Sequence, residues 1–297
     1  MPEHSPLASP KATIAALRDY GLYTKKSLGQ HFLIDDGVVG KILKLAKPAP
    51  EATLLEVGPG IGTLTLALLA TGNPVIAVEK DAALLPVLQR ISGTEGAAPF
   101  VTLRQDALDL DALAGHLPQT PLELVANLPY QVAATVVLAY FEHLPHLQSA
   151  TVMVQREVAE RMKARPATKA YGAYTVKLAL LASVTGSFSV ARTSFLPPPR
   201  VDSTVIRLER RASVPLPGTD HADLAAFVDA AFAMRRKTLL NNLRAAWPAC
   251  PPDRLVVALA KRGFAPNLRA EALSPEDFIQ LFTDLRRTSA ADGAWLR

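Results

Sequence analysis

Short apolar runs alternate with helical stretches between residues 53 and 154, and this alternation limits the folds open to the chain. Buried strands separated by helices are typical of a parallel, doubly wound sheet. Ligands in such sheets bind at the carboxyl ends of the strands. We therefore predict an α/β fold with a Rossmann-like sheet. The predicted strands cover residues 54–57, 75–78, 101–103, 122–125 and 150–154, and the predicted helices cover 63–70, 82–91 and 133–141.

A chain of 297 residues is long for one core and suits two domains. After the alternating region, we expect helices near 155–165 and 173–183 and a strand pair at 187–191 and 204–208. Two prolines and a glycine then predict a linker over 212–220. The predicted division is an N-terminal extension over 1–24 with a frayed start over 1–10, a sheet domain over 25–211 and an all-helical domain over 220–297.

Charge is unevenly distributed along the chain. Residues 48–154 carry 3 Lys/Arg and 10 Asp/Glu, whereas the other residues carry 29 basic and 17 acidic side chains. Residues 155–211 alone hold 11 basic and 4 acidic side chains. An acidic middle with basic flanks suggests a small-ligand site beside a surface that binds a polyanion, and nucleic acid is favoured over charge scattered for solubility.

The lone Cys250 cannot form an internal disulfide, which suits a reducing compartment. No apolar run approaches the roughly 18 residues of a membrane span. The first thirty residues lack the apolar stretch of a signal peptide. We therefore predict a cytoplasmic protein without a membrane partner.

A glycine-rich turn, Gly58-Pro59-Gly60-Ile61-Gly62, follows the first predicted strand and opens a helix. Glycines let a ligand approach the backbone closely, but their spacing departs from the dinucleotide fingerprint, which disfavours a dinucleotide-dependent oxidoreductase. Glu79 ends the next strand and can accept hydrogen bonds from ribose hydroxyls, while Asp106 ends the third and can accept from an adenine amino group. The three features predict an adenosine-bearing ligand without phosphates, and S-adenosylmethionine (SAM) fits.

Asn127-Leu128-Pro129-Tyr130 follows the fourth predicted strand. An amide oxygen and a backbone carbonyl there can accept hydrogen bonds from an NH₂ group, and the tyrosine ring can stack on the attached base. Proline stiffens the turn and donates no N–H. The motif predicts alkylation of an exocyclic amine on a nucleobase.

With these motifs, the chain resembles the ribosomal RNA adenine N6,N6-dimethyltransferases over about residues 25–285. Besides the motifs above, the resemblance rests on four segments: residues 27–33, Lys169-Ala170-Tyr171-Gly172, residues 195–203 and residues 235–243. The segment at 235–243 favours the housekeeping enzymes of the small subunit over resistance enzymes that act on the large subunit.

The resemblance implies that two adjacent adenosines in the 3′-terminal hairpin loop of 16S rRNA, within the immature 30S subunit, are dimethylated with SAM. S-adenosylhomocysteine would be the product. It also implies a role in late subunit assembly and kasugamycin sensitivity. The oligomeric state is left open, with a monomer as the default for an enzyme that must dock on a ribosomal particle. The implied cofactor-binding residues are Gln30, His31, Leu33, Gly58, Gly60, Glu79, Lys80, Asp106, Ala107 and Asn127. Family members often carry Asn in place of His31, where a backbone contact to SAM is implied, so we expect the change to be mild.

The residues predicted to act on the target base are Asn127, Leu128, Pro129, Tyr130 and Phe195. Tyr130 and Phe195 would sandwich the base, with core packing as the alternative for Phe195. The residues predicted to bind rRNA are Arg156, Arg161, Lys163, Arg200, Arg235, Arg236, Lys237 and Arg244, with Arg244 expected farther along one helix with residues 235–237. A solvated helix face is the alternative for any one of them.

Two other functions remain open: a large-subunit rRNA methyltransferase of the resistance type, and a non-catalytic RNA-binding assembly factor with the same fold. A metal site is not predicted, because His143 and His146 lie near Pro145 without a further cluster of ligands.

Overall fold

The computed structural model describes residues 3–23, 30–92, 98–212 and 221–291. Residues 27–29, which begin the family segment at 27–33, lie outside these ranges. So do residues 213–220 of the predicted linker. Two compact units divide the chain: Met1–Ala159 with Ala182–Arg210, and Glu160–Leu181 with Arg211–Arg297.

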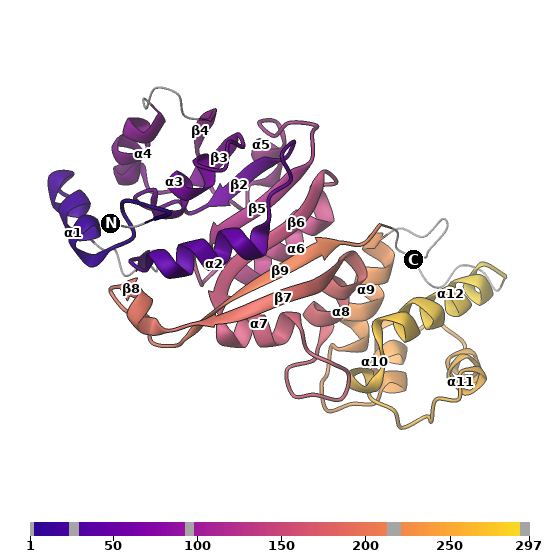
Figure 1. Ribbon diagram of the computed structural model, residues 1–297. Coiled ribbons are helices and arrows are strands. Elements are labelled where there is room, and N and C mark those ends of the chain that lie inside the picture. The colour runs from indigo at the N-terminus through magenta and orange to yellow at the C-terminus, as the bar shows by residue number, and fades with distance from the viewer. Residues whose placement is uncertain (1–2, 24–29, 93–97, 213–220, 292–297) are drawn as a thin grey trace. The chain divides into compact units, whose positions relative to one another are not determined.

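The sheet unit contains seven strands in the order β4-β3-β2-β5-β6-β9-β7 (Figure 1). The first five in this order are parallel, β9 is antiparallel to β6, and β7 is antiparallel to β9. The strands are β2 Thr53–Val57, β3 Val75–Glu79, β4 Phe100–Arg104, β5 Leu122–Asn127, β6 Leu147–Gln155, β7 Ala182–Val190 and β9 Ser203–Arg210. The predicted α/β class and the late strand pair are confirmed, although β7 begins within the segment predicted as a helix to 183.

Helices cover both faces of the sheet. Apolar side chains of α2 (Asp36–Ala46), α3 (Thr63–Leu69) and α4 (Leu85–Ser92) share one buried cluster with the central strands. Figure 1 shows α2 in front of the sheet and α6 (Ala133–His143) behind it. Because both faces are covered, β2 and β3 are buried along their whole length, which explains their continuous apolar runs. The short helices η2 (Ala82–Leu84) and α5 (Leu110–Ala114) follow β3 and β4.

Residues 3–10 are held in place by hydrogen bonds and by the start of a helix, so the prediction of a frayed start over 1–10 is wrong for them. The backbone N–H groups of Glu3, His4 and Ser5 donate to the Asp36 carboxylate at 2.6–3.2 Å. Helix α1 (Pro10–Asp19) follows, capped by Ser9. The segment is held because a carboxylate on α2 accepts hydrogen bonds from successive backbone donors.

The second unit is helical. Its helices are α8 (Ala173–Leu181), α9 (His221–Ala231), α10 (Leu239–Ala246), α11 (Pro252–Lys261) and α12 (Pro275–Ala291), with the short η4 (Ala270–Ala272). Helix α7 (Arg156–Met162) contains the boundary between the two units. Gly263 ends α11 in the left-handed region at φ 71°, and Ser274 and Asp277 cap the start of α12.

The predicted domain boundary at 211 misplaces residues 160–181. Tyr171, Val176 and Leu180 lie in the same buried cluster as Phe227, Leu243 and other side chains of the C-terminal helices. The helical unit is therefore assembled from two separate stretches of chain. A linear division of the sequence could not assign residues 160–181 to the helical unit, because the side chains that bury them lie far away along the chain.

Candidate functional site

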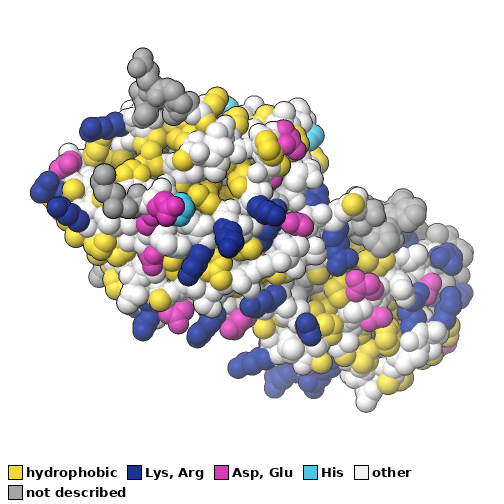
Figure 2. Space-filling view, viewed as in Figure 1, with side chains coloured by type: hydrophobic (Ala, Val, Ile, Leu, Met, Phe, Trp, Pro, Cys, Tyr) yellow, Lys and Arg dark blue, Asp and Glu magenta, His cyan; other side chains and the backbone are white. Residues whose placement is uncertain are grey.

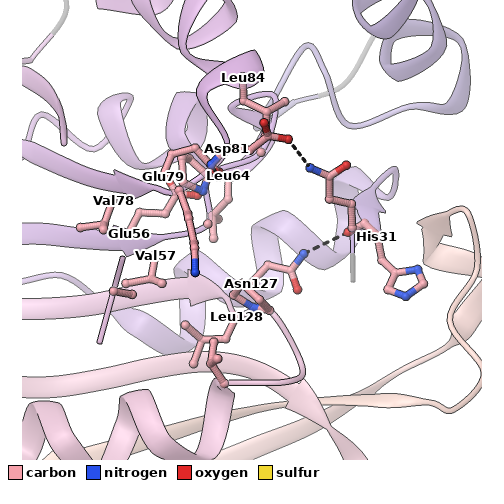
Figure 3. A pocket seen from close by; sticks show the side chains of 18 of the residues that line it. His31, Glu56, Val57, Leu64, Val78, Glu79, Asp81, Leu84, Asn127 and Leu128 are labelled. Atoms are coloured by element: carbon pink, nitrogen blue, oxygen red, sulfur yellow. Dashed lines mark hydrogen bonds between the residues drawn. The ribbon is translucent and has the colours of Figure 1, made fainter. Parts of the chain in front are cut away.

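A cavity of about 210 Å³ opens at the carboxyl ends of β2, β3, β4 and β5. The short strand β1 (Phe32–Leu33), which pairs with β8 (Phe195–Leu196), supplies another wall. Figure 3 shows Glu79 and Asp81 on one side of the cavity and Asn127 and His31 on another. The predicted strand ends therefore meet at one site.

The glycine turn forms the part of the cavity next to α3. Gly58, Gly60 and Gly62 all have positive φ, at 70°, 62° and 88°. A Cβ on Gly58 would lie 3.2 Å from the Pro129 ring, and a Cβ on Gly60 would lie 3.3 Å from the Phe32 ring. The turn needs glycine both for its backbone conformation and for the close approach of its neighbours.

Two buried glutamates stand at the ends of neighbouring strands. Burial raises the pKa of Glu79, although the N–H of Asp81 donates to its Oε1 at 2.7 Å. Burial also raises the pKa of Glu56 to about 8, against the opposing hydrogen bond of 2.6 Å from the Thr65 hydroxyl. Both side chains line the cavity, and the Glu79 carboxyl would offer acceptors to a bound group with hydroxyl donors.

Asp106 pairs with Lys80. The Lys80 ammonium donates to Asp106 Oδ2 at 2.7 Å and, with the N–H of Leu108, lowers the pKa of this carboxyl. Among the described residues that line the cavity, Lys80 is the only lysine or arginine. Because its charge is already matched by Asp106, the described wall of the cavity offers no unmatched cation for a phosphate.

Two polar atoms at the cavity wall are buried with no hydrogen-bond partner among the described residues: Thr63 Oγ1 and Gln105 Nε2. Buried polar groups are normally paired, so these two are suited to bind a polar ligand. Adenosine fits this set, because its ring nitrogens accept and its amino and hydroxyl groups donate. The sequence prediction missed Thr63 and Gln105, although Gln105 directly precedes Asp106 and could have been found from that position.

The Asn127 amide is oriented by the chain itself. Its Nδ2 donates to the backbone carbonyl of His31 at 3.3 Å, which leaves Oδ1 to accept from a ligand. The Leu128 N–H donates to Met153 O, and the Pro129 carbonyl accepts from the N–H of Val132. No described residue donates to the Leu128 carbonyl, which is therefore the better second acceptor in the turn.

His31 makes contacts that the sequence prediction missed. Its ring stacks on Tyr130 with 5.6 Å between centroids and an interplanar angle of 28°. Its Nδ1 lies 2.8 Å from the carbonyl oxygen of Pro197. The hydroxyl of Tyr130 is 2.6 Å from Ser203 Oγ, and burial raises the pKa of this tyrosine. The two rings form one platform beside Asn127.

Phe195 does not line this cavity. Its side chain is 2% exposed, and it packs in the cluster that contains Leu33 and Val38, because β8 pairs with β1. The prediction that Phe195 stacks on the target base is therefore wrong for this structure, and its alternative, core packing, holds. The other predicted catalytic and cofactor-binding residues all line the cavity: Gln30, His31, Leu33, Gly58, Gly60, Glu79, Lys80, Asp106, Ala107, Asn127, Leu128, Pro129 and Tyr130.

The predicted RNA-binding residues fall into both units. Arg156 and Arg200 belong to the sheet unit, where Arg156 lies 3.7 Å from Asp202. The others belong to the helical unit: Arg161, Lys163, Arg235, Arg236, Lys237 and Arg244. Residues 235–237 form a turn and share no helix with Arg244, because Thr238 caps α10 and the helix begins at Leu239.

Among the described residues, no cluster of three or more His, Cys, Asp or Glu side chains could hold a metal ion. Within the same ranges, no helix has both the length and the apolar character to cross a bilayer.

Comparisons with known proteins agree with this geometry. A sequence profile of the family described as ribosomal RNA adenine dimethylase matches residues 21–286. The chain is 41% identical over 261 residues to ribosomal RNA small subunit methyltransferase A of Streptomyces griseus, which covers 87% of this chain and 88% of the relative. It is 38% identical over 280 residues to the protein of the same name from Listeria monocytogenes, covering 93% of this chain and 95% of that relative.

Solved structures with the same architecture include a dimethyladenosine transferase from Plasmodium falciparum, with a TM-score of 0.74, 25% identity, and coverage of 87% of this chain and 98% of that one. The 23S rRNA methyltransferase ErmE has a TM-score of 0.65 and 26% identity, and the match covers 86% of this chain and 99% of that one. The likeness extends over nearly the whole length of both neighbours.

Proposed function

The chain belongs to the ribosomal RNA adenine dimethylase family, and on that basis we propose that it dimethylates N6 of two adjacent adenosines in the 3′-terminal hairpin loop of 16S rRNA. The family is one of SAM-dependent methyltransferases that act on ribosomal RNA. We further propose that the substrate is the immature 30S subunit and that the enzyme acts late in its assembly, as a monomer in the cytoplasm. The observation that carries the proposal is the oriented Asn127 amide beside an adenosine-sized cavity.

The small subunit is favoured over the large one by sequence. Relatives named for the small subunit are 36–41% identical to this chain, whereas the 23S enzyme ErmE is 26% identical. A role as a non-catalytic assembly factor is disfavoured, because the acceptors of the Asn127 turn and the acids at the strand ends are all in place.

The cavity would hold the cofactor through groups that the chain positions. Glu79 would accept from the ribose hydroxyls, while Asp106 and Gln105 would hydrogen-bond the adenine edge. Gly58 and Gly60 would allow close approach of the backbone. When bound, SAM supplies the methyl group on its sulfonium.

The Asn127 turn would orient the target amine. The lone pair of an adenine amino nitrogen is delocalised into the ring, so the nitrogen is a weak nucleophile. Hydrogen bonds from its NH₂ group to Asn127 Oδ1 and the Leu128 carbonyl would favour tetrahedral geometry and free the lone pair. The same two acceptors stabilise the positive charge that develops on nitrogen. The methylated ammonium is acidic enough to lose its proton to water, so the turn needs no strong base.

The Tyr130 ring, backed by His31, would stack on the target base. A stack of this kind contributes about 1–3 kcal/mol per base. A loop adenine is already weakly stacked, so its extrusion costs little. The exposed basic side chains would contact rRNA phosphates, which makes binding dependent on salt.

The test is to incubate the protein with radiolabelled SAM and small subunits that lack the modification, and then to map the labelled bases. We expect label on N6 of two adjacent adenosines in the 3′-terminal hairpin loop, with four methyl groups per subunit at completion. Label on large-subunit rRNA would support the resistance-type alternative. Absence of label, with rRNA binding retained, would support the non-catalytic one.

A further inference from the structure

A second cavity, of about 270 Å³, lies within the helical unit. It is formed by residues 171–173, by the turn between α9 and α10, and by η4. This volume is similar to that of the cofactor cavity, so a nucleobase fits in it.

The apolar wall of the cavity is held rigid. Tyr171 is buried, donates its hydroxyl hydrogen to Leu273 O at 2.7 Å, and meets the ring of Phe232 edge-on at 6.2 Å. The buried Asn242 donates to the carbonyls of Ala231 and Met234 at 2.6 and 3.3 Å, which fixes the turn between α9 and α10. A flat ligand would meet preformed walls, so little ordering would be needed on binding.

The rim of the cavity combines cations with an exposed apolar side chain. Met234 is 59% exposed, which is unusual for so large an apolar group. Arg235 donates to Lys169 O at 2.8 Å and lies 3.7 Å from Glu271, whereas Lys237 is exposed and makes no ion pair with any described residue. Lys and Arg side chains also gather over the visible surface of this unit (Figure 2). Cations beside an apolar surface suit a ligand that is both flat and anionic.

We propose that this cavity binds one unpaired nucleotide of the ribosomal RNA substrate. The base lies against Phe232 and Met234, the neighbouring phosphate contacts Lys237, and the Glu271 carboxylate can accept from an amino group on the base. This inference rests on the proposed function. It adds a base-binding contact to what would otherwise be a set of phosphate contacts.

Gly172 offers a way to fill the cavity without removing charge. It lines the cavity, and a Cβ built on it meets no atom within 4 Å. The Cβ of Gly172→Leu therefore has open space, and the side chain adds bulk to the cavity. Met234→Ser removes the apolar rim at an exposed position, so it tests the same contact if the first variant folds poorly. The matched control is Val257→Leu, at a residue of α11 that is 60% exposed and outside the cavity.

The measurement is the KM for small subunits lacking the modification, at several salt concentrations. We expect Gly172→Leu and Met234→Ser to raise this KM about tenfold, as loss of one base contact predicts. The slope of binding against salt should stay as in the wild type, because no phosphate contact is lost, whereas Lys237→Gln should lower it by about one. The affinity for SAM should not change in these variants. The Val257→Leu control should keep the wild-type KM and salt slope.

A KM close to the wild-type value in both variants would overturn the inference. A change in the salt slope of Gly172→Leu would also overturn it, because such a change would indicate that only phosphate contacts were lost. Wild-type methylation of the same subunits separates this result from failure of the proposed function. If the wild type transfers no label, the proposed function fails; if it does and the variants match it, only the cavity assignment fails.

Discussion

At the residue scale, Asn127 combines a structural contact with a proposed catalytic one. Its Nδ2 is held by His31 O, so the same side chain presents Oδ1 to the target amine. We predict that Asn127→Ala slows methyl transfer by about 100-fold or more, in the range found when one preorganised partner of a developing charge is removed. SAM affinity should change little. Single-turnover rates and calorimetric binding of SAM check this, with Gln131→Ala, at another wall residue, as the control. A wild-type single-turnover rate would end the assignment.

Two substitutions at His31 separate its contacts and therefore test the aromatic platform formed with Tyr130. His31→Phe keeps a ring against Tyr130 but loses the contact of Nδ1 with Pro197 O, while His31→Asn loses the ring. Both keep the backbone carbonyl that binds Asn127. We expect His31→Asn to raise the KM for small subunits several-fold more than His31→Phe does, because only His31→Phe keeps the stabilising aromatic pair with Tyr130. Equal KM values for the two variants would show that the stack does not position the base.

Glu56 makes stability depend on pH. Its pKa is raised by burial to about 8 from an ordinary value of 4.5, so the folded protein keeps this proton when the unfolded chain has lost it. The free energy of unfolding should therefore fall as pH rises from about 4.5 to 8 and level off above that range. Glu56→Gln removes the titration and can still accept from Thr65.

We therefore predict that Glu56→Gln matches the wild type near pH 5 and exceeds its stability by several kcal/mol at pH 8. Urea unfolding at the two pH values checks this. Parallel changes in the two proteins would show that Glu56 does not hold a proton in the fold.

At the scale of elements, the N-terminal segment supports the cofactor cavity. Leu17 of α1 and Tyr20, which directly follows the helix, pack against a cluster with Phe32 and Leu84, and the last two also line the cavity. The segment before α1 is held by Asp36, whose hydrogen bonds from three backbone N–H groups outweigh its partial burial and lower its pKa.

We predict that Asp36→Ala loosens this segment, speeds tryptic cleavage at Lys11, and weakens SAM binding several-fold. Asp19→Ala is the control, since Asp19 is an exposed carboxylate of the same helix that pairs with its neighbour Arg18. Cleavage and SAM affinity that match the control would show that the segment does not support the cavity.

At the scale of the whole molecule, the helical unit needs both of its stretches of chain. A chain that ends at Arg211 keeps residues 160–181 but loses the helices that bury Tyr171, Val176 and Leu180. We predict that it exposes apolar surface, binds a hydrophobic dye and aggregates. If Glu160–Leu181 is also replaced by a Gly/Ser linker, the sheet unit should stay monomeric and bind SAM. Dye fluorescence and size-exclusion chromatography distinguish the two chains, and a well-behaved chain ending at Arg211 would contradict the division into units.

The sequence alone determined the features that depend on local pattern. The alternation of apolar runs and helices predicted the parallel sheet, and the polar residues after each run predicted the cavity, because parallel strands end at one edge of the sheet. The caps that start α12 and end α11 are equally local, since each is formed within a few residues.

Tertiary structure decided everything that depends on contacts between distant segments. Phe195 became a core residue because β8 pairs with β1, and His31 became part of the base platform because its segment lies beside Tyr130. Residues 160–181 joined the C-terminal helices because their apolar side chains are buried there. No local pattern encodes these outcomes, since the partner that buries or orients each side chain lies far away in the chain.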